Sequence, residues 1–214
     1  MATAEQMAAY AAYLRSHTVA HNKPVTEICI FQLQPQFWHD HSTALAKFES
    51  QIVANTAPGG NKPNAQGIRK IAYGFSVDDA GAFVWMLDWE KIQDHWDFWQ
   101  TAAFPPVMNA ITELFVAGRP LVRHYDFGEA GMLDREFEVA RVLVWDDGEV
   151  KPLGNVTSCV NARQTREGYA VDVNETTWWC SLLGYESEAD CRADELNVRC
   201  GPAAEKHIVR LQYI

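Results

Sequence analysis

The sequence predicts an α+β fold made of two copies of one unit, each with strands and helices in the order βαββαβ, the ferredoxin-like pattern. The first observation is a strand that passes directly into a helix. Residues 82–89 are rich in aromatic and branched side chains, as in a buried strand, and Trp89, Ile92, Trp96 and Trp99 then have the spacing of one helix face. This step organises the first copy.

The second observation is that the same step recurs. Residues 180–190 align with residues 84–94, so that Tyr185 corresponds to Trp89. Cys191 then stands where the first copy has His95. We therefore expect any chemistry that needs this histidine to be confined to the first half.

The third observation is the order of the remaining elements. A capping box of Thr3 and Gln6 predicts an N-terminal helix to near Arg15, and the turn-rich run 57–64 predicts a surface loop. The first copy then contains strand 25–33, helix 45–53, strands 68–75 and 82–89, helices 90–99 and 105–115, and strand 121–127. The second contains strands 137–145, 169–173 and 177–185, helix 188–196 and strand 207–213. Residues 151–166 lack helical periodicity, so its first helix is eroded.

These elements divide the chain into three parts. We expect an N-terminal helical arm at 1–22, a first ferredoxin-like repeat at 23–128 and a second, degenerate repeat at 135–214. A polar, glycine-containing linker separates the repeats.

Composition and charge exclude several classes of function. The 214 residues carry a formal net charge of -10, which argues against nucleic-acid and anionic-membrane partners. There is no secretion signal and no long apolar span, so we expect a cytoplasmic protein. Five cysteines without CxxC spacing predict reduced thiols. No phosphate-binding loop, nucleophile elbow or HExxH motif is present, and we expect neither a cofactor nor a metal.

The step at residues 85–95 and the segment from Phe98 to Phe127 resemble the dimeric α+β barrel superfamily. Within it they are similar to antibiotic-biosynthesis-monooxygenase-like domains, which occur in tandem in many fungal proteins. The resemblance covers about half of the chain well. It implies that the antiparallel sheets of the two repeats form one barrel within the chain, and that a small molecule binds between a sheet and its helices. Members catalyse different reactions, so the resemblance leaves the reaction open.

His95 is the first candidate for proton transfer. Its spacing puts it at the edge of the apolar helix face, where an imidazole reaches a pocket, and the resemblance favours such a position. A histidine on the outer helix surface is the alternative. His124 and Asp126 alternate on one strand face and are candidates to orient one another, although a solvated strand gives the same pattern.

The candidate substrate contacts are mostly aromatic. Most of the eight tryptophans are expected in the core, where each large ring stabilises the fold by roughly 2 to 3 kcal/mol. Tyr73, Trp85 and Trp99 are the rings that we expect to line a cavity for an apolar ligand. His41 is a further candidate, and Arg123 either anchors an anionic or carbonyl group or forms an internal ion pair.

The run His39-Asp40-His41 contains metal-capable atoms. Neighbouring side chains in a turn rarely point the same way, so we expect Asp40 to cap a helix and the imidazoles to stay free of metal.

The leading functional hypothesis is a cofactor-free enzyme of secondary metabolism that isomerises or cyclises a hydrophobic polyketide or terpenoid intermediate. A cofactor-independent monooxygenase is the alternative within catalysis, and a non-catalytic ligand-binding or stress-response barrel is the alternative outside it. All three predict a hydrophobic small-molecule partner, and all leave homodimer formation open.

Overall fold

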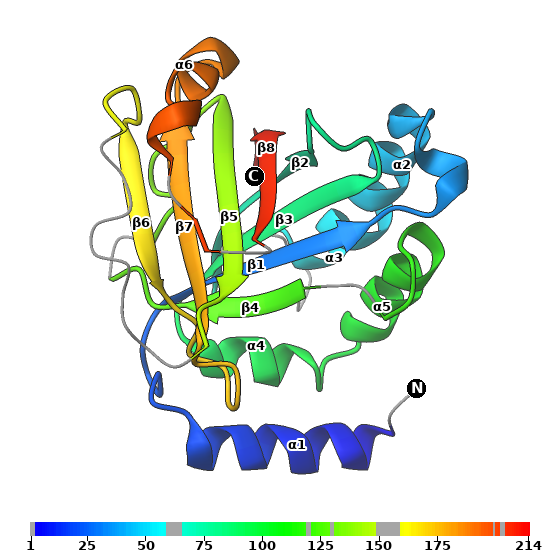
Figure 1. Ribbon diagram of the computed structural model, residues 1–214. Coiled ribbons are helices and arrows are strands. Elements are labelled where there is room, and N and C mark those ends of the chain that lie inside the picture. The colour runs from blue at the N-terminus through cyan, green and yellow to red at the C-terminus, as the bar shows by residue number, and fades with distance from the viewer. Residues whose placement is uncertain are drawn as a thin grey trace.

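The computed structural model shows two antiparallel sheets packed face to face, with helices on their outer faces (Figure 1). It describes residues 3–58, 66–118, 121–128, 131–148, 159–198, 200–201 and 204–214. The α-helices are α1 (Ala4–His17), α2 (His41–Lys47), α3 (Ala54–Thr56), α4 (Ile92–Phe98), α5 (Phe104–Leu114) and α6 (Glu188–Ala193). The strands are β1 (Val25–Gln32), β2 (Ile68–Phe75), β3 (Ala82–Trp89), β4 (Leu121–Tyr125), β5 (Val139–Asp146), β6 (Gln164–Tyr169), β7 (Trp178–Tyr185), β8 (Glu205–Arg210) and β9 (Gln212–Tyr213). Short 3-10 helices occur at Pro35–Phe37 and Glu195–Asn197, and a π-helix at Phe48–Val53 joins α2 to α3.

The two sheets close into a barrel. The strand order is β4-β1-β3-β2-β9 in the first sheet and β6-β7-β5-β8 in the second. Isolated bridges between Ser76 and Val209 and between Tyr125 and Ala170 connect the sheets at their edges. This architecture confirms the predicted α+β class with two antiparallel ferredoxin-like sheets.

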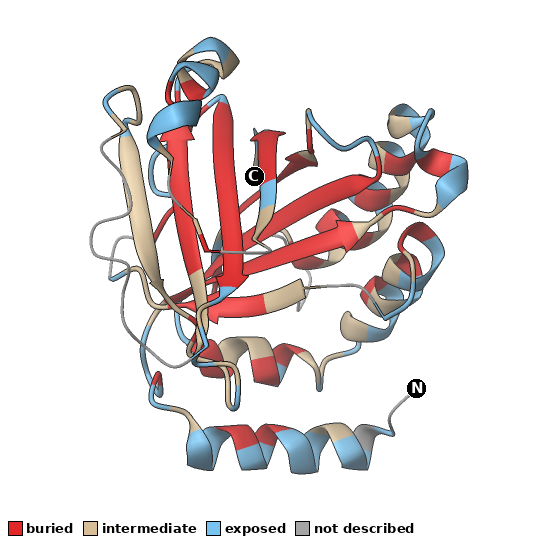
Figure 2. Cartoon of the chain, viewed as in Figure 1, coloured by how far each residue is buried: buried red, intermediate tan, exposed pale blue. Residues whose placement is uncertain are grey.

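Side-chain alternation along the strands separates an inner apolar layer from an outer one. In β1, Ile28 and Ile30 point into the barrel, whereas Cys29 and Phe31 point toward the helices of the first half. The central strands of both sheets are buried along almost their whole length (Figure 2). The side chains between the central strands of the two sheets therefore form a packed core.

The pairing registers agree with the expected duplication. Val25 pairs with Trp89 in the first sheet, and Val139 pairs with Tyr185 at the corresponding place in the second. The N-terminal capping box is also confirmed, since Thr3 accepts the backbone N–H of Gln6, although α1 runs to His17 rather than ending near Arg15.

Two expected strands differ from the structure. The strand predicted at 169–173 lies earlier in the chain, as β6 at Gln164–Tyr169. Beyond Tyr169 the chain turns toward β4, where Val171 N–H donates to His124 O at 2.9 Å. The closing strand predicted at 207–213 is divided, since β8 pairs with β5 and β9 crosses to pair with β2 in the other sheet.

Two further expectations concern residues that the structure describes only in part. Most of the predicted loop 57–64, and residues 151–158 of the segment without a helix, lie outside them. The three-part domain division stays a prediction. Among the described residues, none of the helices is both long and apolar enough to cross a membrane.

Candidate active site

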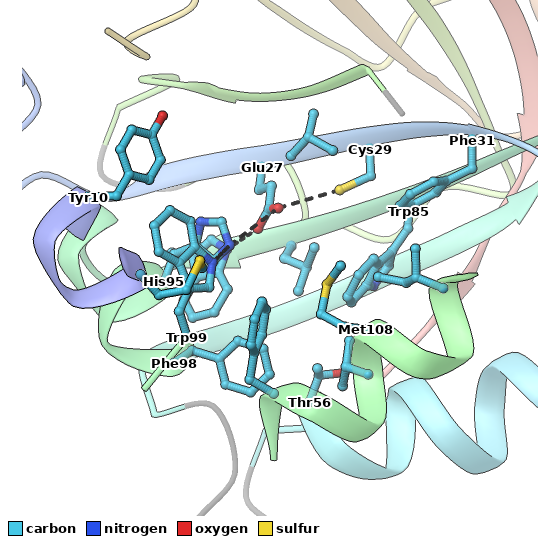
Figure 3. Close-up of a pocket in the computed structure, with 17 residues that line it drawn as sticks. Tyr10, Glu27, Cys29, Phe31, Thr56, Trp85, His95, Phe98, Trp99 and Met108 are labelled. Carbon is cyan, nitrogen blue, oxygen red and sulfur yellow. Dashed lines mark hydrogen bonds and ion pairs between the residues drawn. The ribbon is translucent and has the colours of Figure 1, made fainter. Parts of the chain in front are cut away.

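A cavity of about 310 Å³ lies between the outer face of the first sheet and the helices α1, α4 and α5. The strands supply Glu27 and Cys29 from β1 and Trp85 and Trp89 from β3, because alternate residues face the helices. The remaining walls are mostly apolar: Met7, Tyr10, Phe31, Thr56, Leu87, His95, Phe98, Trp99, Phe104, Val107, Met108, Ile111 and Val122 (Figure 3). Such a lining suits a hydrophobic ligand with one polar group.

Glu27 and His95 form the polar end of the cavity, and His124 lies directly behind them. Glu27 and His124 are directly opposite each other in the pairing of β1 with β4, and His95 comes from α4. His95 Nδ1 lies 2.8 Å from His124 Nε2, and the carboxylate oxygens of Glu27 lie 3.7 Å from His95 Nε2 and 3.8 Å from His124 Nε2. All three side chains are nearly buried, so their electrostatic interactions are weakly screened.

A fourth polar side chain, Asp172, comes from the second half of the chain. Its carboxylate accepts the backbone N–H of His124 at 2.7 Å and lies 2.8 Å from His124 Nδ1. The segment that carries Asp172 is the one that leaves β7 after Tyr169. The site therefore needs both halves of the duplication.

Two tryptophans fix the remaining hydrogen bonds. Trp89 Nε1–H donates to Glu27 Oε2 at 2.7 Å, and Trp99 Nε1–H donates to His95 Nε2 at 3.0 Å. When Trp99 donates to Nε2, a neutral His95 carries its proton on Nδ1 and donates it to His124 Nε2. His124 in turn donates from Nδ1 to Asp172. With His124 neutral, a continuous hydrogen-bonded chain thus leads from the cavity to Asp172.

Burial and neighbouring charges give the two imidazoles different pKa values. Burial, with a smaller contribution from the charge of His124, lowers the pKa of His95 to about 4 against the opposing charges of Glu27 and Asp172. Burial would also lower the pKa of His124, but the charge of Asp172 and its hydrogen bond, with the charge of Glu27, raise that pKa to about 9. A proton accepted by the pair consequently resides on His124, and His95 returns to its neutral form.

The structure brings together four of the predicted site residues. His95 lines the cavity with Trp85 and Trp99, so the alternative of a histidine on the outer helix surface is wrong. His124 also belongs to the site, although its carboxylate partner is Asp172 and not Asp126. The expected mutual orientation of His124 and Asp126 is wrong, because Asp126 pairs with Lys23 at 3.3 Å near the surface.

The other predicted contacts lie away from this cavity. Tyr73 faces the same helix layer, but its hydroxyl donates to Glu49 at 3.0 Å. His41 stacks on Phe75 and bonds to the carbonyl of Ala80, beside a separate groove.

Arg123 points to the opposite side of β4 from His124. Its guanidinium lies 3.5 Å from the centre of the Trp178 ring and pairs with Glu175 at 2.5 Å. This is the internal ion pair, the second of the two roles considered for Arg123.

Sequence reasoning missed Glu27 and Asp172. Glu27 is the single charged residue within the apolar run 25–31, and such an isolated charge in a buried strand is a usable signal. Asp172 carried no comparable signal, since its contact with His124 joins residues of different halves.

The corresponding position of the second copy has different chemistry. By register, Arg141 takes the place of Glu27 and Ile208 that of His124. Arg141 donates to Cys191, the residue aligned with His95. The acid-base residues are therefore present in the first copy and replaced in the second.

Comparison with solved structures identifies the class of fold. The chain has the fold of tandem ferredoxin-like α+β barrels. An anthrone oxidase-like protein matches with a TM-score of 0.56 at 11% identity, covering 91% of this chain and 94% of the other. A candidate monooxygenase of Fusobacterium nucleatum matches with a TM-score of 0.54 at 10% identity, covering 91% and 94%. A candidate chlorite dismutase matches with a TM-score of 0.50 at 8% identity, covering 88% and 95%.

At these identities the likeness concerns the fold alone. No protein-family model and no curated protein matches the chain. The expected fungal subgroup receives no support from the comparisons, while the predicted fold of two ferredoxin-like sheets in one chain is confirmed.

Proposed function

We propose that this protein is an enzyme that removes a proton from a hydrophobic, ring-containing substrate and lets the resulting carbanion react with dioxygen, as a cofactor-independent monooxygenase. The observation that carries the proposal is the position of His95. Its imidazole stands at the polar end of an otherwise apolar cavity, with a second imidazole and a carboxylate hydrogen-bonded behind it.

This arrangement suits a proton relay. When His124 is neutral, His95 Nε2 takes the substrate proton while His95 Nδ1 passes its own proton to His124 Nε2, so the positive charge forms on the ring that Asp172 supports. Because the pKa of His124 is raised to about 9, this neutral form becomes more abundant as the pH rises toward 9, and the rate should rise with it. Trp99 has to release its hydrogen bond to His95 Nε2 as the substrate enters. The remaining walls are apolar, which excludes water and prevents premature protonation of the carbanion.

The oxidation balances without a further reactant. In a substrate whose acidic carbon is a CH₂ group, that group becomes a carbonyl, one oxygen atom of O₂ enters it and the other leaves as water. The names of two structural neighbours, a candidate monooxygenase and an anthrone oxidase-like protein, are consistent with this reaction class. They favour oxygenation over the isomerisation or cyclisation that the sequence first indicated.

The cavity also offers a donor for a carbonyl oxygen. Trp85 Nε1 is buried and has no hydrogen-bond partner among the described residues. Trp85 and His95 lie at opposite ends of the cavity in Figure 3. A flat ring ketone such as anthrone likewise has its acidic CH₂ and its carbonyl oxygen at opposite ends of the molecule.

The test is oxygen consumption with anthrone as the first substrate. We expect O₂ uptake, one ¹⁸O atom from ¹⁸O₂ in the product, and a loss of at least about 100-fold in rate for His95→Gln, the usual contribution of general-base catalysis. His21→Gln is the matched control, since His21 is exposed and outside the cavity.

Each other outcome identifies a different function. Product that forms under strict anaerobiosis replaces the monooxygenase with an isomerase or cyclase acting through the same base. Saturable quenching of tryptophan fluorescence without any product, across a panel of ring ketones and polyketide intermediates, indicates a non-catalytic binding barrel. An unchanged rate for His95→Gln removes His95 from the mechanism.

A further inference from the structure

The polar end of the cavity has a property that the proposed acid-base role does not use. Glu27, His95 and His124 are, within the described part of the chain, the one group of three His, Cys, Asp or Glu side chains whose donor atoms converge within 4.8 Å of one another. The geometry points to a binding site for one divalent transition-metal ion, with Glu27, His95 and His124 as its protein ligands.

The donor distances are close to those that a metal ion requires. With bonds of about 2.1 Å, two ligand atoms at right angles are about 3.0 Å apart and two opposite ones about 4.2 Å apart. Glu27 Oε1 lies 3.7 Å from His95 Nε2 and Glu27 Oε2 lies 3.8 Å from His124 Nε2, inside this range. The 2.8 Å contact between the rings uses the other nitrogen of His95, Nδ1. An ion bound through His95 Nε2 therefore takes the lone pair of His124 Nε2 that accepts this hydrogen bond, and it displaces Trp99 Nε1–H from His95 Nε2.

The local charge also favours a cation. In the described part of the chain, the ion-pair partners of Glu27 are the two imidazoles, so this buried carboxylate faces neither Lys nor Arg. Asp172 adds a second carboxylate behind His124. A divalent ion would take the place of the proton on His124 and would also neutralise Glu27, where a buried charge without compensation is costly.

The outer contacts match those of metal-binding histidines. His124 places Nε2 toward Glu27 and His95, while its Nδ1 is held by Asp172 at 2.8 Å. A carboxylate in this position fixes the ring orientation and raises the basicity of the ligating nitrogen. Glu27 is similarly held by Trp89 Nε1–H at 2.7 Å.

The ligand set indicates the class of metal. Two histidines and one carboxylate are typical of Fe²⁺, Co²⁺ and Zn²⁺ sites that keep positions open for another ligand. His95 and Glu27 also line the cavity, so an open position would face the space where a small molecule binds. The nitrogen that binds the ion cannot take a proton, so metal binding and the proposed base role exclude each other.

The experiment is a titration of EDTA-treated, full-length protein with Co²⁺. Isothermal titration calorimetry should give one ion per chain, and the visible d–d absorption should report nitrogen and oxygen ligands. Glu27→Gln and His124→Asn should each weaken binding by at least about 100-fold, and Asp172→Asn by about 10- to 100-fold. His39→Gln, which alters the His39-Asp40-His41 run, should bind Co²⁺ as the wild type does.

Circular dichroism of every variant shows whether it is folded. No Co²⁺ binding by the wild type, or unchanged affinity in a folded Glu27→Gln variant, overturns the metal site. Activity assays separate this inference from the proposed function. Inhibition by one bound ion fits both, whereas activity that appears only with the ion would refute the base role of His95 and leave the metal site in place.

Discussion

Replacement of Asp172 by asparagine tests the hydrogen-bonded chain that joins the two halves. The side chain keeps its size, and its remaining carbonyl oxygen can still accept the backbone N–H of His124. The amide group then faces His124 Nδ1 and donates to it, which moves the imidazole proton to Nε2 and breaks the relay from His95. We expect the rate of the proposed reaction to fall by about 100- to 10,000-fold, as when a catalytic histidine is held in the wrong tautomer.

The same variant has a calculable effect on stability. The rise in the pKa of His124 from 6.5 to about 9 corresponds to about 3 kcal/mol in favour of the protonated ring, at about 1.4 kcal/mol per pH unit. Because this pKa is raised in the folded state, the contribution is complete below pH 6.5 and is lost as the pH rises through 9. Asp172→Asn should therefore lower the free energy of unfolding by about 3 kcal/mol at pH 6 and by much less at pH 10.

The assay is urea unfolding of metal-free wild-type and variant protein at the two pH values, with an NMR titration of His124. The titration should give a raised pKa in the wild type and a clearly lower one in the variant, because burial then lowers the pKa of His124 with Glu27 alone opposing it. Asp126→Asn is the control, because Asp126 is two residues from His124 but pairs with Lys23. Equal destabilisation at both pH values would refute the assignment of Asp172 as the electrostatic partner of His124.

Three further predictions concern the barrel core, the wall of the cavity and stability at acidic pH. Met86→Ala should lower the free energy of unfolding by about 2 to 5 kcal/mol, because Met86 is fully buried between the sheets. The ligand affinity, measured by tryptophan fluorescence, should not change. A weakened affinity would contradict the placement of the cavity on the outer face. Tyr10→Ala should speed ligand release, seen in stopped-flow fluorescence, because Tyr10 lines the cavity and stacks on Trp99 at 6.0 Å; an unchanged release rate would show that α1 does not restrict the exit. Burial lowers the pKa of His207, so the stability that depends on its neutral form is lost as the pH falls below 6.5. In urea unfolding, the free energy of unfolding of His207→Gln should therefore fall less between pH 7 and pH 5 than that of the wild type. Equal decreases in the two proteins would contradict the burial of His207.

Much of the fold followed from local pattern. The change of period at Trp89 located both β3 and α4, and the repeat of this step around Tyr185 located β7 and α6. The alternation of side chains along a strand also predicted correctly that His124 and Arg123 point to opposite sides of β4. Such features depend on neighbours within a few residues, which the sequence displays directly.

The candidate site was predictable only in part for the same reason. His95, Trp85 and Trp99 were found because each belongs to the strand-to-helix step. The pairing of His124 with Asp126 was the wrong choice among nearby carboxylates, because the true partner, Asp172, is distant in sequence.

The sequence by itself determined that two ferredoxin-like units would be present, and that a histidine on the α4 helix would border an aromatic layer. Only the tertiary structure decided that the barrel interior is filled, that the cavity lies under α1, α4 and α5, and that Glu27, His95, His124 and Asp172 meet at its polar end. The physical reason is that hydrophobic periodicity is a local property of the chain. The position of a buried charge depends on strand register and on segments from the other half, which periodicity does not encode.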